Sequence, residues 1–440
     1  MDFSEASLQL AELGVLLPEI LVPRTGSDIG TWAVIACDQY SSEPEYWNKV
    51  SEAVGSSPSA FHCILPELYL DSPRAEEYVT FIIKGKMREY LDAGIFRGLA
   101  PGLVLVDRAT PHHASRRGMV VALDMECYDF RQGTKSLIRP TERTIVERIP
   151  PRVKIRKGAA LELPHIMVLM DDPKNEVLDP LFALAGNEEP VYQGELMLGS
   201  GHITGRWLSA EKAAPLLAES LGALRSRGRK HNLLFAMGDG NHSLATAKAV
   251  WEEAKLLLTA EQRKTHPLRY ALVEIVNLYD PGIEFHPIHR ILTGVNPAEF
   301  FAFLRKKRGL RLEDTRSVEE TTAAMASRQE KNAFTAGLLS SREKAVLVLK
   351  KEKSFLPTGK IQDLLEEFQK GAGGKIDYIH GEASLAALAD TEDSVGILLP
   401  GLPKDKLFPV VIAEGVLPAK AFSLGEAPEK RFYIEARRIG

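Results

Sequence analysis

Residues 233–255 read LLFAMGDGNHSLATAKAVWEEAK, and this stretch decides the fold class of the chain. The largely apolar residues 232–237 predict a buried strand. The polar residues 238–243 interrupt that run, and the pattern of residues 243–255 predicts a helix. A strand that leads through a glycine-rich turn into a helix is a building unit of mixed α/β domains.

The same alternation of strands and helices extends along the chain. Val- and Leu-rich segments and helical patterns follow one another between turn signals. The expected strands are 102–107, 118–125, 269–278, 344–350, 394–400 and 430–439, and the expected helices are 71–94, 208–228 and 297–307. We therefore expect an α/β (mixed α+β) fold with mixed sheets. A main unit, residues 1–295, carries the site, and a C-terminal α/β unit, residues 296–440, packs on it.

The composition excludes several classes of protein. The 440 residues are 45% hydrophobic and 26% charged, with a formal net charge of −4, so we expect no nucleic-acid partner. No apolar run approaches the roughly 20 residues that span a bilayer, so we expect no membrane partner. The cysteines Cys37, Cys63 and Cys127 form no C-x-x-C pair, and the acidic start is unlike a signal peptide. These features favour a cytoplasmic protein.

The turn at residues 238–243 has the composition of an anion site. Its glycines let the backbone approach a ligand closely, and the free amides of the following helix favour negative charge. Asp239 and His242 add a carboxylate and an imidazole, which suit acid–base work. A simpler alternative is that Asp239 or Asn241 caps the helix and the glycines only form the turn. Capping, however, does not call for His242 or for glycine on both sides of Asp239. The candidate residues of this turn are Gly238, Asp239, Gly240, Asn241, His242 and Ser243.

Three further segments carry candidate site residues. Asp38 follows the apolar strand WAVIA, where polar groups commonly line a crevice, although a turn before a helix would also explain it. Glu142 and Arg143 lie in an arginine-rich segment, for which a solvated face of weak ion pairs is the alternative. His289 and Arg290 end the sequence HPIHR and suit an anionic ligand. No third ligand accompanies the histidines of HPIHR, so we predict no metal site there.

The sequence GDGNHSLATAK (238–248) resembles the DGHHRYETA signature of the domain-of-unknown-function 1015 family. Other segments also resemble that family, and the resemblance covers nearly the whole chain. These segments are 32–47, 138–173, 266–292, 376–382 and 417–439. The chain is thereby identified as a member of this family.

The signature is in turn similar to the nucleotide-phosphate turn of ParB/sulfiredoxin-like domains, which include free-serine kinases. This resemblance implies a ParB/sulfiredoxin-like core, an anionic small-molecule ligand, and ATP or ADP with Mg²⁺ as cofactor. The chain departs from the signature at Asn241, which replaces a histidine, and at Ser243, which replaces an arginine. Because serine cannot bind phosphate as a bidentate cation, the charge would have to come from Arg143, Arg269 or Arg290.

The function that this resemblance implies is a nucleotide-dependent phosphotransferase acting on a small hydroxylated metabolite. The helix after Gly240 would hold a phosphate, His242 would stabilise the transferred charge, and Asp38 or Glu142 would take the hydroxyl proton. The missing arginine favours a second hypothesis, a non-catalytic nucleotide or metabolite sensor. A third is a metal-assisted hydrolase using Asp239, His242 and His289. We expect Asp38, Glu142, Asp239, His242 and His289 to share one pocket.

The C-terminal segment predicts a half-buried strand that pairs within a sheet. In this segment Phe432, Ile434 and Ala436 alternate with the more polar Tyr433, Glu435 and Arg437.

Overall fold

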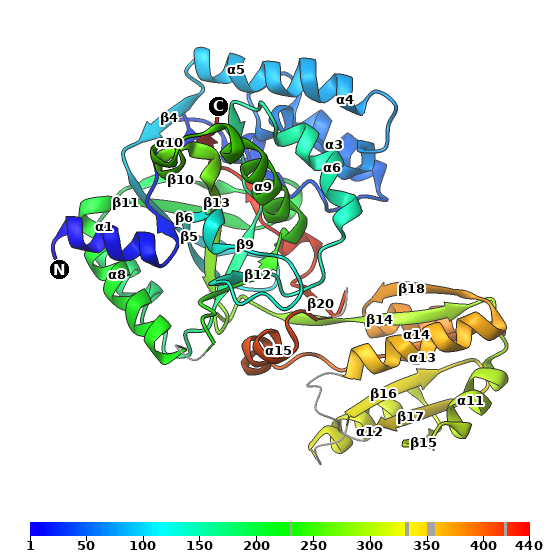
Figure 1. Ribbon diagram of the computed structural model, residues 1–440. Helices are drawn as coiled ribbons and strands as arrows, with labels where there is room; N and C mark the ends of the chain where they lie inside the picture. The colour runs from blue at the N-terminus through cyan, green and yellow to red at the C-terminus, as the bar shows by residue number, and fades with distance from the viewer. Residues whose placement is uncertain (229–230, 331–333, 350–356, 418–419) are drawn as a thin grey trace. The chain divides into compact units, whose positions relative to one another are not determined.

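The computed structural model describes residues 1–228, 231–330, 334–349, 357–417 and 420–440 (Figure 1). The chain forms two compact units, Met1–Glu284 with Gly425–Gly440, and Phe285–Leu424. This division differs from the expected one at residue 295, because the end of the chain belongs to the first unit.

A mixed nine-stranded sheet forms the centre of the first unit, in the order β10-β11-β5-β6-β13-β9-β12-β7, with β1 paired to β6. Its strands are β1 (Val15–Leu16), β5 (Gly102–Ala109), β6 (Arg117–Asp124), β7 (Ile138–Arg139), β9 (Met167–Met170), β10 (Pro190–Glu195), β11 (His202–Ser209), β12 (Phe235–Asp239) and β13 (Tyr270–Asn277). Strands β13 and β9 are parallel, as are β12 and β7, and the other pairs are antiparallel. The predicted α/β class with mixed sheets is therefore confirmed.

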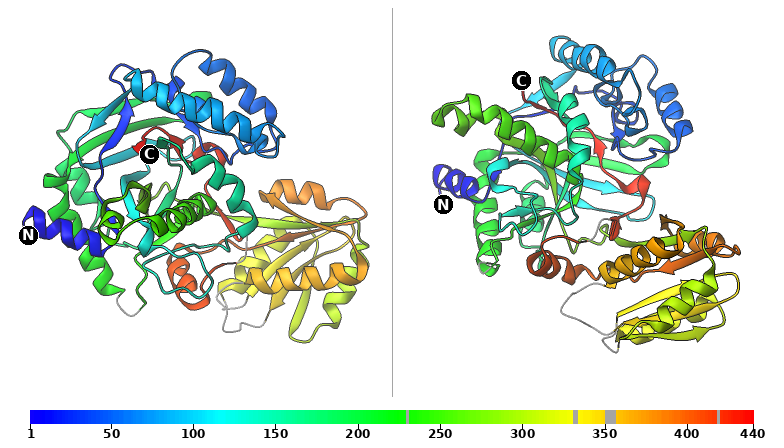
Figure 2. Two further views of the ribbon diagram at one scale, coloured as in Figure 1. Left: turned by 45° about the horizontal axis from the view of Figure 1, so that its top comes forward. Right: turned by 45° about the vertical axis from the view of Figure 1, so that its right-hand side comes forward.

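Helices cover both faces of this sheet (Figure 2). The helices of the first unit are α1 (Phe3–Glu12), α2 (Ile29–Trp32), α3 (Pro44–Val54), α4 (Ala75–Glu77), α5 (Lys84–Asp92), α6 (Ile149–Arg156), α7 (Leu178–Leu184), α8 (Ala210–Arg227), α9 (Asn241–Ala254) and α10 (Ala260–Thr265). The expected helix 71–94 consists of α4, a π-helical segment Tyr78–Ile83 and α5. None of the helices in the described ranges is long and apolar enough to cross a membrane.

Alternating side chains of the central strands divide the core into two layers. In β5, Leu103 and Leu105 enter the layer that contains α1, α8 and α9. Val104 and Val106 enter the opposite layer, which contains α3, α5 and the C-terminal segment. A strand that contributes to two cores must be apolar on both faces, which explains the continuous Val and Leu run.

Short strand pairs complete the first unit, and two of them tie the C-terminal segment to it. The pairs are β2 (Ile20–Pro23) with β4 (Phe96–Leu99), β3 (Val34–Ile35) with β21 (Phe432–Tyr433), and β8 (Leu161–Glu162) with β22 (Arg437–Arg438). The expected pairing of the C-terminal segment is confirmed, but the expected exposed face is wrong. Tyr433, Glu435 and Arg437 are also buried, because the second side of the segment carries ion pairs that stay inside the protein.

The second unit contains a seven-stranded antiparallel sheet, in the order β15-β17-β16-β19-β14-β18, with β20 paired to β14. Its strands are β14 (Phe285–Thr293), β15 (Leu310–Thr315), β16 (Phe334–Leu339), β17 (Lys344–Leu349), β18 (Lys375–His380), β19 (Ser394–Leu398) and β20 (Phe422–Leu424). Its helices are α11 (Pro297–Lys306), α12 (Val318–Glu330), α13 (Pro357–Ala372), α14 (Glu382–Ala389) and α15 (Leu407–Glu414).

Candidate functional site

The topology of the central sheet brings three chain segments to one edge. Because β12 is antiparallel to β9, the end of β12 at Asp239 lies opposite Met167, at the beginning of β9. His165 lies just before β9, separated from it by one residue. Because β12 is parallel to β7, the residues after β7 leave the sheet at the same edge, and Thr141 Oγ1 donates a 2.7 Å hydrogen bond to Met237 O.

The two glycines around Asp239 have separate structural roles. Gly238 lies at an irregularity between β12 and β9, and Gly240 has a left-handed backbone with φ of +77°. A Cβ on Gly240 would also lie 3.1 Å from Ile166 Cα, so this position favours glycine twice over. The backbone turns here so that one Asp239 oxygen accepts a hydrogen bond from Gly240 N, at 2.9 Å. The other lies 3.2 Å from Lys430 Nζ.

Helix α9 begins without a capping side chain from the described part of the chain. Asp239 bonds the Gly240 amide, which precedes the helix, so the capping alternative for Asp239 and Asn241 is wrong. Asn241, His242 and Ser243 form the first turn and are partly buried. Their amides belong to the group that has no partner within a helix and that favours an anion.

His242 is a neutral side chain at pH 7. Its Nε2 accepts a 3.3 Å hydrogen bond from Ile145 N, which places the ring hydrogen on Nδ1. Burial, with Arg152 and Arg148 adding to its effect, lowers the pKa of His242 to about 4, although Asp38 opposes the shift. His242 is therefore a hydrogen-bond donor in this site and carries no charge.

Asp38 follows β3 and joins the same group of residues. Its Oδ2 lies 3.9 Å from His165 Nε2, and its Oδ1 accepts a 3.1 Å hydrogen bond from Gln39. Burial raises the pKa of Asp38, but His165, Gln39 and Lys430 lower it more, so the net shift is downward. The carboxylate is therefore ionised at neutral pH. Burial and the nearby Asp38 raise the pKa of the Cys37 thiol well above its usual range, so Cys37 is no nucleophile.

We name Asp38, His165, Asp239, His242 and Lys430 the α9 site. Asp239 pairs with Lys430 and Asp38 faces His165, and the charge of Lys430 links the two pairs by lowering the pKa of Asp38. His242 joins them because Asp38 influences its pKa.

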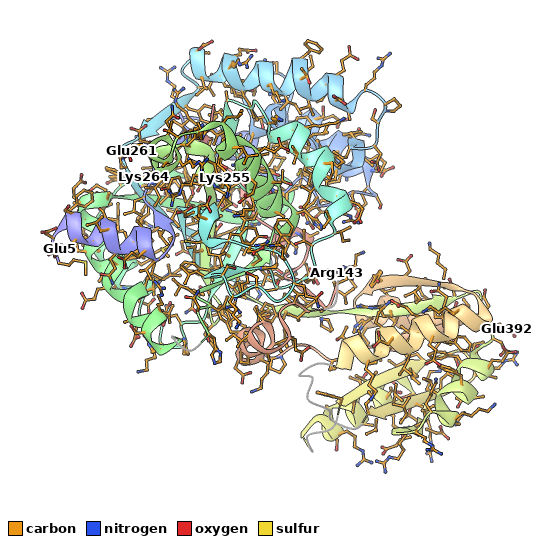
Figure 3. All side chains as sticks on the ribbon, in the orientation of Figure 1. Glu5, Arg143, Lys255, Glu261, Lys264 and Glu392 are labelled. Carbon is orange, nitrogen blue, oxygen red and sulfur yellow. The ribbon has the colours of Figure 1, made fainter. Side chains whose placement is uncertain are left out.

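The cations of the α9 site differ from those expected. Arg269 forms hydrogen bonds of 2.6 and 3.0 Å with Asp124, so its guanidinium is engaged by a carboxylate outside the α9 site. Arg143 is exposed on the loop before α6 (Figure 3). Glu142 is half-buried and takes part in a polar interaction.

Lys430 and Arg152 supply positive charge instead. Lys430 is buried and pairs with Asp239, and Arg152 pairs with Glu67. The sequence offers little sign of Lys430, because the pattern of its segment predicts a structural strand. A signal was present, however: the run EKR directly before FYIEAR puts three charges at the start of a strand that must be paired.

His289 and Arg290 belong to the second unit and are both buried in β14. His289 Nδ1 accepts a 3.1 Å hydrogen bond from Leu399 N, and burial lowers the pKa of the ring to about 4. Arg290 lies over the Tyr378 ring at 4.5 Å and donates to Lys420 O at 3.1 Å. These contacts explain the positions of His289 and Arg290 within the second unit. All residues of the α9 site belong to the first unit, so the site does not include His289 or Arg290.

The oxygen atoms of the α9 site suit a magnesium ion brought by a nucleotide. No group of three His, Cys, Asp or Glu side chains that could hold a metal occurs in the described ranges. Mg²⁺ bound with phosphates can be held by a single protein carboxylate, which Asp239 could provide. The buried Oδ1 of Asn241 also has no hydrogen-bond partner among the described residues, so an oxygen ligand is left over at the start of α9.

The family model described as "Protein of unknown function (DUF1015)" matches residues 21–368. The chain belongs to the DUF1015 family. The resemblance stated from the sequence is thus confirmed, and the match includes every α9-site residue except Lys430. For this DUF1015 chain, no match was found among curated proteins.

Three solved structures are similar to this DUF1015 chain at low scores. Free serine kinase in complex with AMP matches with 12% identity and a TM-score of 0.38, over 73% of this chain and 92% of the other. A conserved hypothetical protein from Pyrococcus furiosus matches with 11% identity and a TM-score of 0.35, over 70% and 90%. SbnI with C-terminal truncation from Staphylococcus aureus matches with 9% identity and a TM-score of 0.36, over 70% and 82%.

Proposed function

We propose that the α9 site is the active site of a nucleotide-dependent phosphotransferase that acts on a hydroxyl group of a small metabolite. The observation that carries this proposal is the start of α9. The helix begins at a left-handed glycine without a capping side chain from the described residues, next to the buried cation Lys430 and the ionised Asp38. Phosphate binds well where helix amides and a cation converge.

Each residue of the site has a role in this proposal. The first-turn amides of α9 hold a phosphate, while Lys430 and Arg152 balance its charge. Asp38 takes the proton of the attacking hydroxyl, as an ionised carboxylate can at neutral pH. Neutral His242 donates a hydrogen bond from Nδ1 to a phosphate oxygen. Mg²⁺ brought by the nucleotide would be held by Asp239 and would supply further charge neutralisation.

A sensor that binds a nucleotide without transfer is the second candidate. It is favoured by Ser243, which replaces the arginine of the related signature, and by the pairing of Arg152 with Glu67. Both features reduce the positive charge available to a transferred phosphoryl group.

A thermal-shift panel tests phosphate binding. The panel contains AMP, ADP, ATP and inorganic phosphate, each with and without Mg²⁺. A ligand at a hundredfold excess over its Kd stabilises the folded state by about 2.7 kcal/mol. We expect at least one nucleotide to raise the unfolding temperature. If no phosphate compound stabilises a well-folded sample, the proposal is wrong.

A turnover assay then separates the enzyme from the sensor. ATP and ADP are each incubated with a panel of small hydroxylated metabolites, and nucleotide conversion is followed by chromatography. Asp38→Asn is the matched variant, because it keeps the shape of the side chain and removes the base. Transfer that Asp38→Asn abolishes supports the enzyme; nucleotide binding without transfer to any metabolite supports the sensor.

A further inference from the structure

Two side chains, Tyr433 and His165, lead from the C-terminal strand toward Asp38. The hydroxyl of Tyr433, in β21, lies 2.7 Å from His165 Nδ1. The other ring nitrogen of His165, Nε2, lies 3.9 Å from Asp38 Oδ2. Tyr433 and His165 are buried, at 3% and 8% exposure, while Asp38 is half-buried. Strand β21 pairs with β3, which ends just before Asp38, so the sheet itself sets this arrangement.

The hydrogen bonds of Tyr433 determine which nitrogen of His165 carries the hydrogen. The Tyr433 oxygen accepts a 3.3 Å hydrogen bond from Cys37 N. The Cys37 side chain also bonds this hydroxyl, and a thiol is a weak acceptor. The strong acceptor within reach of the hydroxyl hydrogen is therefore His165 Nδ1. A buried hydroxyl that failed to donate would incur a desolvation cost, so the hydroxyl donates to Nδ1.

An acceptor at Nδ1 places the hydrogen of the neutral ring on Nε2, which faces Asp38. We infer that His165, held in this tautomer by Tyr433, is the positioning residue that orients Asp38 toward the substrate hydroxyl. This inference rests on the proposed function. The separation of 3.9 Å is longer than a hydrogen bond, and such distances commonly shorten when the substrate binds.

The sequence of events balances without a further reactant. The substrate O–H bond breaks as its oxygen attacks the phosphoryl group, and the proton passes to an Asp38 oxygen. The bond between the phosphoryl group and the nucleotide breaks and leaves its electrons on the nucleotide. His165 takes up no proton in this sequence and donates its Nε2 hydrogen to the other Asp38 oxygen.

Nitrogen NMR tests the tautomer directly. In a two-bond ¹H–¹⁵N spectrum, the His165 signals are assigned by their loss in His165→Gln. We expect an unprotonated Nδ1 and a protonated Nε2 in the unmodified protein, and a mixture of tautomers in Tyr433→Phe. A protonated Nδ1, or an unchanged pattern in Tyr433→Phe, would overturn the inference.

Two substitutions of His165 test the role in turnover. The side-chain amide introduced by His165→Gln can reach the position of Nε2, whereas the shorter one introduced by His165→Asn reaches only the position of Nδ1. We expect His165→Gln to retain most of the turnover and His165→Asn to lose up to about a hundredfold. The affinity for ADP should stay unchanged in both variants. Equal turnover in the two variants contradicts the positioning role.

The proposed function and this inference fail in different ways. If the unmodified protein transfers no phosphoryl group to any metabolite, the phosphotransferase proposal fails. The ring-nitrogen spectrum then still decides whether Tyr433 holds His165 with its hydrogen toward Asp38.

Discussion

Replacing Arg431 by Met should loosen the segment that brings Lys430 and Tyr433 to the α9 site. Arg431 is 4% exposed, and it bonds Glu274 at 2.8 Å and Glu435 at 2.7 Å. Both carboxylates are also buried. The variant leaves two buried negative charges without their cation, so the loss exceeds that of an ordinary hydrogen bond.

The size of the effect follows from the burial of the group. Removing one partner of a buried ion pair costs about 3–5 kcal/mol. At about 2 °C per kcal/mol for a unit of this size, the unfolding temperature of the first unit should fall by roughly 6–10 °C. Calorimetry of the whole chain measures this shift.

Two further variants make the result specific. Arg131 forms a comparable pair with Asp129 at 2.7 Å, but its side chain is 83% exposed, so Arg131→Met should leave the melting curve unchanged. Adding Glu274→Gln and Glu435→Gln to Arg431→Met removes the unpaired charges and should recover part of the loss. If Arg431→Met melts at the same temperature as Arg131→Met, the buried ion pair does not hold the segment.

Three other outcomes are expected. Gly240→Ala should lose ADP binding in calorimetric titration. Gly133→Ala is the control and should keep ADP binding, because Gly133 has the same φ of +77° but open space around it. Equal ADP binding by the two variants would exclude a close approach of the backbone to the ligand at α9. In the folded protein the pKa of His242 is lowered to about 4, so the unfolded chain binds a proton at this side chain more readily. The neutral side chain therefore contributes stability above about pH 6.5, and this contribution is lost as the pH falls toward 4. Between pH 7 and pH 5, the unfolding temperature of His242→Gln should therefore fall less than that of the unmodified protein. Finally, Cys37 should resist iodoacetamide at pH 8 in mass spectrometry, because its raised pKa keeps the thiol protonated; rapid alkylation would contradict the buried cluster.

Local sequence patterns predicted the elements that carry the site. The strand, turn and helix at 233–255 are β12, the turn around Gly240, and α9. Strand periodicity and glycine preference depend on contacts within a few residues, so they can be read from a short stretch. The family resemblance rests on the signature at 238–248 and on five further segments, each readable as a local stretch, so the sequence sufficed to identify the family.

Only the tertiary structure decided which charges meet at α9. The sequence offered Arg143, Arg269 and Arg290 as phosphate ligands, but Lys430 and Arg152 contribute the charge near the site. The chain leaves the first unit after Glu284 and returns to it at Gly425. The whole second unit therefore separates Lys430 from its partner Asp239 in the sequence. Charge and apolar pattern state what a residue can pair with, and long-range strand pairing decides which partner it meets. The pairing of β21 with β3 brings Lys430, Tyr433 and Asp38 together, and no local periodicity encodes that pairing.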